Sequence, residues 1–288
     1  MSVVSVAELQ RAWLAVQDGR FRPGATDLPP RRRHAPQDGA GEGSTWDPGV
    51  PVLPVLGCHG SAGATTVAVA VATALELQVR VVEASPAGSS GLTGFATAEL
   101  GETGSGWVRG HRDLLVLDRL LDGYASPDQI PVPDPDPGLD PRAAPQLTVL
   151  DAGWPMGPLV RSAGWLRASV LDSDRVVLVT TATVPGLRRL EGVLHELDPH
   201  PEAVVVAVQG PRRRRWPREV VSCIGPRTRS LLEEDLVEVP HDPGLAVRGL
   251  DTSPLPGGVL SAATTIAQLL QLAGSSIHHQ KGSTQHVR

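Results

Sequence analysis

The chain has 288 residues, a formal net charge of −5 and 41% hydrophobic residues. This length suits one large α/β domain or two small ones, and the net acidic charge argues against a wholly basic nucleic-acid binder. Two cysteines offer no disulfide framework, no apolar run reaches the ~18 residues of a membrane span, and the N-terminus lacks a signal-peptide pattern. We therefore expect a soluble, cytoplasmic protein that does not enter a membrane.

Residues 1–49 are expected to form a short helix followed by a disordered linker. Ser5 and Glu8 have capping-box spacing at the start of a predicted helix over 5–17, whose apolar residues fall on one face. The linker that follows is rich in Pro, Gly and Arg, a composition that buries too little apolar surface to order itself. Such a flexible N-terminal arm favours docking of a protein partner by the helix; packing of the helix on its own domain is the alternative.

Residues 50–273 alternate uniformly apolar segments with helical ones. This alternation predicts a three-layer α/β domain with a doubly wound, mostly parallel sheet, like that of a P-loop NTPase. Residues 127–145 are expected to be a Pro-rich loop, and residues 274–288 a flexible polar tail. The predicted strands are 52–56, 79–83, 147–151, 176–179, 203–208 and 236–239, and the predicted helices are 64–77, 114–121, 159–171, 187–197 and 259–272.

A glycine-rich loop at 57–66 follows the first predicted strand and leads into an Ala/Val-rich helix. Glycines in this context let backbone N–H groups turn toward a phosphate, and the helix N-terminus adds partial positive charge. Thr65 stands where a hydroxyl would ligate Mg²⁺, whereas Ala64 stands where a phosphate-binding lysine belongs. Lys281 is the only lysine in the chain. The alternative is that small residues merely permit a tight turn. The nucleotide-binding candidates in the loop are Cys58, His59, Gly60, Ser61, Ala62, Gly63, Ala64, Thr65 and Thr66.

Two acidic residues come at the ends of predicted strands and are the catalytic candidates if the protein is active. Asp151 could hold Mg²⁺ together with Thr65, directly or through water; the alternative is that it caps the next turn. Glu83 could position an attacking water, although Ser85 stands where a second acid is expected. Because ligands of such sheets bind beyond the carboxyl ends of the strands, we expect these acids to lie near the loop.

A Cys-His pair and a run of arginines each have a functional and a simpler interpretation. Cys58 and His59 are sequence neighbours, which rarely present their side chains to each other, so we expect neither covalent catalysis nor a metal site there. The basic run Arg212, Arg213, Arg214 and Arg215 could contact a nucleic-acid backbone or a nucleotide. Its simpler interpretation is a solvated loop.

In their order along the chain, these features resemble the ParA/MinD family of P-loop ATPases with a deviant Walker A loop, in an actinobacterial-type member associated with plasmids or conjugation. The resemblance implies binding of ATP or ADP with Mg²⁺, a homodimer, and base contacts near Gln209, Pro240 and Asp242. The stretches that resemble family motifs are 59–66, 82–86, 149–153, 177–186 and 239–243.

The departures from the family fall on the chemistry, because His59 and Ala64 replace both family lysines. Losing one charge-assisted bond to phosphate costs ~1.5–3 kcal/mol, or one to two decades of affinity. Our leading hypothesis is a weak or inactive ATPase that acts as a scaffold in plasmid maintenance, conjugative transfer or related positioning. The second is an active Mg-ATP switch in which an arginine, such as one of 212–215, replaces the lysine. The third is a DNA-binding module that uses the arginine run and the N-terminal arm.

Overall fold

The computed structural model describes residues 45–86, 91–135, 144–198, 201–232 and 235–272. The predicted helix at 5–17, the linker up to residue 44 and the tail at 274–288 lie outside the described residues. None of the helices in the described ranges combines the length and apolar character needed to cross a membrane.

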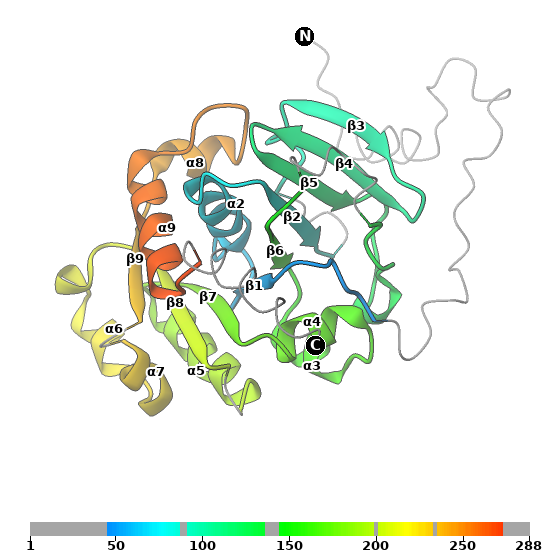
Figure 1. Ribbon diagram of the computed structural model, residues 1–288. Helices are drawn as coiled ribbons and strands as arrows, with labels where there is room; N and C mark the ends of the chain where they lie inside the picture. Colours follow the sequence, from blue (N-terminus) through cyan, green and yellow to red (C-terminus); the bar gives the residue numbers. More distant parts are fainter. Residues whose placement is uncertain (1–44, 87–90, 136–143, 199–200, 233–234, 273–288) are drawn as a thin grey trace, which may run out of the picture. The chain divides into compact units, whose positions relative to one another are not determined.

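A nine-stranded sheet forms the middle layer, in the order β3-β4-β5-β2-β6-β1-β7-β8-β9 (Figure 1). The seven neighbouring strands β5-β2-β6-β1-β7-β8-β9 are parallel to one another. Strands β4 and β3 extend the sheet beyond β5 with antiparallel pairing. This confirms the predicted three-layer, doubly wound, mostly parallel sheet. The strands are β1 (Val52–Gly57), β2 (Val79–Ala84), β3 (Ala98–Glu102), β4 (Trp107–Arg112), β5 (Leu115–Leu120), β6 (Leu147–Ala152), β7 (Arg175–Thr181), β8 (Ala203–Gly210) and β9 (Leu236–Pro240).

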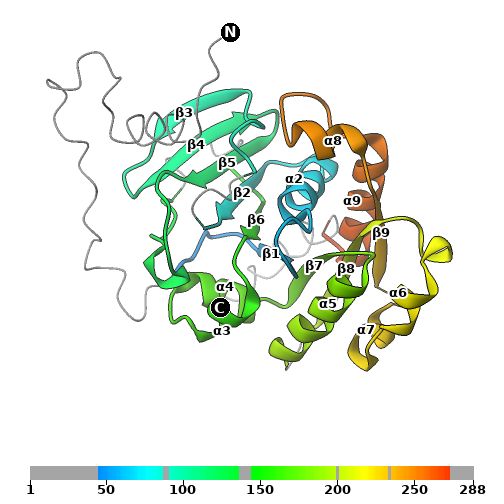
Figure 2. The same cartoon turned by 180° about the vertical axis from the view of Figure 1, so that it is seen from behind.

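Helices cover both faces of the sheet, as the two opposite views show (Figures 1 and 2). Because successive strand residues point to opposite faces, Val81 and Val149 pack with the helices of one face, and Val82 and Leu150 with those of the other. Burial on both sides explains why the central strands are apolar throughout. On the first face lie α2 (Ala64–Ala74) and α9 (Gly257–Leu269); the second is covered by α3 (Met156–Arg161), α4 (Trp165–Leu171), α5 (Val184–Glu196), α6 (Arg218–Ser222) and α7 (Pro226–Leu231).

The helix predicted over 114–121 is wrong, because this segment is strand β5. Its short apolar run fits a buried strand as well as a helix, and both strand faces are buried here. The hairpin partner of β5, strand β4, and the exposed strand β3 were not predicted. Another correction concerns 159–171, which forms two helices, α3 and α4, interrupted at 162–164. The short helices α6, α7 and α8 (Pro243–Arg248) were also not predicted.

A buried ionic cluster fixes the antiparallel extension to the parallel sheet. Asp118 of β5 is completely buried and accepts hydrogen bonds from Arg109 Nε at 2.7 Å and Arg109 Nη2 at 2.8 Å. It also accepts one from Arg80 Nε of β2 at 2.7 Å. The arginines therefore join three adjacent strands through one carboxylate, which a helix over 114–121 could not provide.

Candidate functional site

The glycine-rich loop lies at the carboxyl end of β1, a central strand between β6 and β7, and leads directly into α2. Ser61 and Gly63 adopt left-handed backbone conformations, with φ of 59° and 90°. Gly63 is the N-cap of α2 and has no side chain with which to cap it. The first N–H groups of this 11-residue helix are thus left for an external acceptor, the arrangement found in phosphate-binding loops.

His59 is turned back against the protein. Its Nδ1 lies 2.8 Å from the carbonyl oxygen of Gly60, and its Nε2 lies 3.1 Å from the hydroxyl of Thr181 at the end of β7. A carbonyl only accepts, so Nδ1 must carry a proton, and in the neutral ring Nε2 accepts from Thr181. Because both ring nitrogens are occupied, His59 does not extend a cation over the loop as a lysine would.

Cys58 is buried at the start of the loop, and its amide donates to the carbonyl oxygen of Val179 over 2.8 Å. Burial raises the pKa of its thiol to about 12. The thiol therefore stays protonated at neutral pH, and the structure gives it no role as a nucleophile.

Glu83 and Asp151 are side by side on β2 and β6, on the face covered by α2, and each is 1% exposed. Glu83 Oε1 accepts a 2.6 Å hydrogen bond from the amide of Gly91. Among the described residues, neither carboxylate oxygen of Asp151 has a hydrogen-bond partner. Burial, and secondly the charge of Glu83, raise the pKa of Asp151 to about 7. The Thr65 hydroxyl acts in the opposite direction on this pKa, without reaching hydrogen-bonding geometry with either oxygen.

The donors at this point fit Mg²⁺. Two orphaned carboxylate oxygens beside a threonine hydroxyl are the hard oxygen ligands that Mg²⁺ takes, usually together with water and substrate phosphates. The described residues contain no group of three or more His, Cys, Asp or Glu side chains that could hold a metal without such help. Asp151 and Thr65 would therefore hold a metal ion together with a phosphate.

Two glycines let the surrounding segments approach this centre. A methyl group added at Gly91 would lie 2.8 Å from Thr65 Cγ2, and one added at Gly153 would lie 2.6 Å from Ser85 Cβ. Ser85, which stands at the position of the expected second acid, is thus packed against the end of β6. Glycine is required at both places for lack of room.

Of the residues expected to contact the nucleotide base, one lies at the loop and two lie around α8 and α9. Gln209, at the end of β8, lies over the loop, because its amide would be 3.3 Å from a methyl group at Gly63. Asp242 caps α8 by accepting from the amide of Leu245 over 2.8 Å, and Pro240 packs against Gly258. Base contacts by these residues stay a prediction.

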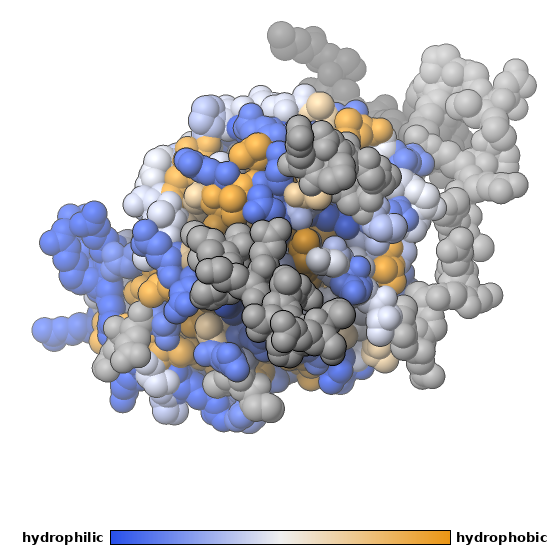
Figure 3. Space-filling model, viewed as in Figure 1, coloured by the Kyte–Doolittle hydropathy of each residue, from blue (hydrophilic) through white to orange (hydrophobic). Residues whose placement is uncertain are grey.

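The arginine run Arg212–Arg215 is exposed, on the side that carries α6 and α7, where hydrophilic residues gather (Figure 3). Arg213 donates to the carbonyl oxygen of Leu232 over 2.8 Å, and its amide donates to Glu238. These contacts connect Arg213 to the end of α7 and to β9.

A different arginine, which the sequence did not single out, lies at the loop. Arg189 of α5 lines a cavity of about 260 Å³ together with His59, Gly60, Thr183, Pro185 and Gly186. Nothing in the sequence distinguishes it from the adjacent Arg188.

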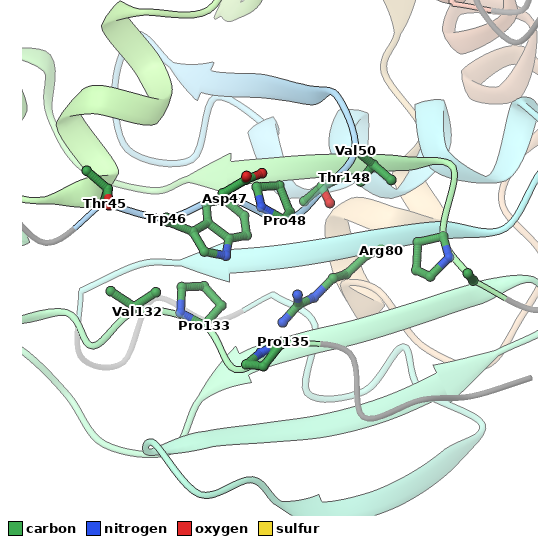
Figure 4. A pocket seen from close by; sticks show the side chains of 12 residues that line it. Thr45, Trp46, Asp47, Pro48, Val50, Arg80, Val132, Pro133, Pro135 and Thr148 are labelled. Atoms are coloured by element: carbon green, nitrogen blue, oxygen red, sulfur yellow. The ribbon is translucent and has the colours of Figure 1, made fainter. Parts of the chain in front are cut away.

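A larger cavity, of about 440 Å³, lies near the start of β2 and β6, at the opposite edge of the sheet (Figure 4). Trp46, Pro133 and Thr148 line it, and Arg80 points into it (Figure 4). The charge of Arg80 is already balanced by Asp118. Since ligands of parallel sheets bind at the carboxyl ends of the strands, the loop is the candidate functional site.

The sheet order and the loop define the fold class, a doubly wound α/β fold like that of P-loop NTPases. No family profile matches the chain, and no curated protein matches it. Among solved structures, the cell-division ATPase MinD of Pyrococcus furiosus is 16% identical over 77% of this chain and 98% of its own, with a TM-score of 0.49. MinD of Pyrococcus horikoshii OT3, complexed with Mg-ADP, is 16% identical over 78% and 98%, also with a TM-score of 0.49. A ParA family ATPase of Chlorobium tepidum TLS is 16% identical over 80% and 94%, with a TM-score of 0.44.

Proposed function

We propose that this protein is a ParA/MinD-like nucleotide-binding protein with a degenerate phosphate loop. It binds ATP or ADP with Mg²⁺ weakly and hydrolyses ATP little or not at all. It acts as a scaffold, with a protein partner and as a homodimer, in plasmid maintenance, conjugative transfer or a related positioning system. The observation that carries the proposal is the juxtaposition of an uncapped α2 N-terminus at Gly63 with the orphaned oxygens of Asp151.

Each described group has a defined task in binding. Amide N–H groups of the loop and of the first turn of α2 donate hydrogen bonds to the phosphate oxygens. Thr65 and Asp151 would hold Mg²⁺, which supplies the positive charge that screens the phosphate oxygens when it is bound. Glu83 is tied to the Gly91 amide, so it serves chiefly to keep the segment after residue 90 over the site.

Weak hydrolysis follows from the missing cations. The transition state of phosphoryl transfer spreads charge over the terminal oxygens, and lysine normally compensates it. Here Ala64 ends at its methyl group, and the nitrogens of His59 are bound to Gly60 and Thr181. The ground state loses one charge-assisted bond, ~1.5–3 kcal/mol, and the transition state loses more.

Calorimetric titration of the purified full chain with ATP and ADP, each with Mg²⁺, tests the proposal. We expect weak binding by the natural protein and binding tighter by roughly tenfold to a hundredfold in Ala64→Lys. Thr73→Lys is the matched control, because it adds a lysine at an exposed position near the far end of the same helix. Absence of nucleotide binding by both the natural protein and Ala64→Lys would overturn the proposal.

A further inference from the structure

We infer that Arg189 is the cation of this phosphate site, and that it contacts the terminal phosphate of a nucleoside triphosphate. The inference rests on the proposed function, because it concerns the same loop. It adds that the protein distinguishes triphosphate from diphosphate through one arginine on α5.

The cavity beside the loop carries the inference. It is lined by His59 and Gly60 of the first half of the loop, and by residues at the start of α5, including Arg189. Its volume of about 260 Å³ falls below the ~300–1,000 Å³ of pockets that enclose whole small molecules. The cavity therefore suits one phosphate group with water better than a base or a sugar.

Among the side chains that line the cavity, Arg189 is the one that can supply positive charge to a phosphate. His59 is bound to Gly60 and Thr181, and the Thr183 hydroxyl accepts from the amide of Gly186 at the start of α5. Gly60 has open space beside it, since a methyl group added there would meet no atom within 4 Å. The remaining cationic side chain on this cavity is the exposed guanidinium of Arg189.

Arginine is suited to this task. Its planar guanidinium presents paired donors that match the oxygens of a phosphate, and it stays charged at all relevant pH values. Its long side chain reaches the cavity from the second turn of α5. The position thus compensates for part of the charge that Ala64 and His59 do not provide.

The position of the cavity predicts which phosphate of the nucleotide contacts Arg189. The amides at the start of α2 form the cradle, and a diphosphate fills it without reaching further. A third phosphate extends beyond the cradle, toward His59 and Gly60, where the cavity and Arg189 lie. Contact with Arg189 therefore adds affinity for the triphosphate and leaves the affinity for the diphosphate unchanged.

Three variants of the full chain, titrated with Mg-ATP and Mg-ADP beside the natural protein, test this inference. In Arg189→Gln we expect the affinity for ATP to fall about tenfold and that for ADP to change less than twofold. Arg189→Lys keeps the charge and should retain most of the ATP affinity. Arg188→Gln is the control, because it removes an exposed neighbouring charge that does not line the cavity, and it should change neither affinity.

The outcomes separate the two proposals. ATP binding by the natural protein that is unchanged in Arg189→Gln would overturn the role of Arg189 and leave the nucleotide site standing. An equal loss for ATP and ADP would also overturn it, because the arginine would then not read the third phosphate. Failure of the natural protein and of Ala64→Lys to bind either nucleotide would overturn the proposed function itself.

Discussion

Glu83 on β2 and Asp151 on β6 occupy the same register of adjacent parallel strands, so two buried carboxyl groups lie side by side beneath the start of α2. Glu83 is held by the amide of Gly91, whereas the oxygens of Asp151 have no hydrogen-bond partner among the described residues. A buried carboxylate in this state is costly unless it is protonated or binds a cation.

The stability of the protein should fall as the pH rises from about 4 to 7. The pKa of Asp151 is raised from 3.8 to about 7 in the folded state, so the folded chain binds more protons than the unfolded chain in this window. Asp151→Asn removes the charge and keeps the shape of the side chain. It should increase the free energy of unfolding at pH 8 by a few kcal/mol and change it little at pH 4, as measured by urea denaturation. An equal effect at both pH values would contradict this assignment.

Magnesium should relieve the same cost. We expect millimolar Mg²⁺ at pH 8 to raise the melting temperature of the natural protein, because the ion binds the folded state at Asp151 and Thr65. The shift should disappear in Asp151→Asn. Differential scanning calorimetry checks this, with Asp172→Asn as a control on a carboxylate of the exposed connection after α4. A Mg²⁺ shift that survives in Asp151→Asn would place the ion elsewhere.

Gly153→Ala should destabilise the protein by about 1–3 kcal/mol through overpacking. The new methyl group would lie 2.6 Å from Cβ of Ser85, so the ends of β2 and β6 must separate. Gly104→Ala is the matched control, since a methyl group there meets no atom within 4 Å. Chemical denaturation measures both variants, and similar stability of the two would show that the site tolerates this separation.

Breaking the buried ionic cluster should cost more. Asp118→Asn leaves the buried Arg80 and Arg109 facing a neutral amide, and we expect a loss of about 3–5 kcal/mol. Asp113→Asn is the control, because its side chain is 87% exposed and asparagine tolerates the positive φ at this turn. Its effect should stay within about 0.5 kcal/mol in the same denaturation assay. Equal losses of stability in the two variants would show that the buried ionic cluster does not stabilise the fold.

The sequence predicted the parts of the fold whose signals are local. The apolar strand before residue 57, the glycine turn and the Ala/Val-rich helix each carry their own pattern, so β1, the loop and α2 were recognised together. Strand β5 was misassigned because a buried apolar run of this length has no distinctive period. Strand β3 was missed because all five of its residues are exposed and it contains two glutamates and a glycine.

The proximity of the candidate site residues was predictable only where these residues follow strands. Glu83 and Asp151 were found because acids at strand ends meet at one edge of a parallel sheet. The contact of His59 with Thr181 joins residues 122 positions apart, and the placement of Arg189 depends on how α5 packs beside the loop. Such relationships arise from tertiary packing, and no spacing in the chain encodes them.

Turnover of ATP tests the central claim most directly. Phosphate release by the purified full chain, with Mg²⁺ and saturating ATP, should be indistinguishable from that of Asp151→Asn, although the natural protein binds the nucleotide. Ala64→Lys serves as the variant that restores one missing cation. Mg²⁺-dependent turnover by the natural protein at the rate of an ordinary ATPase, abolished by Asp151→Asn, would contradict the account.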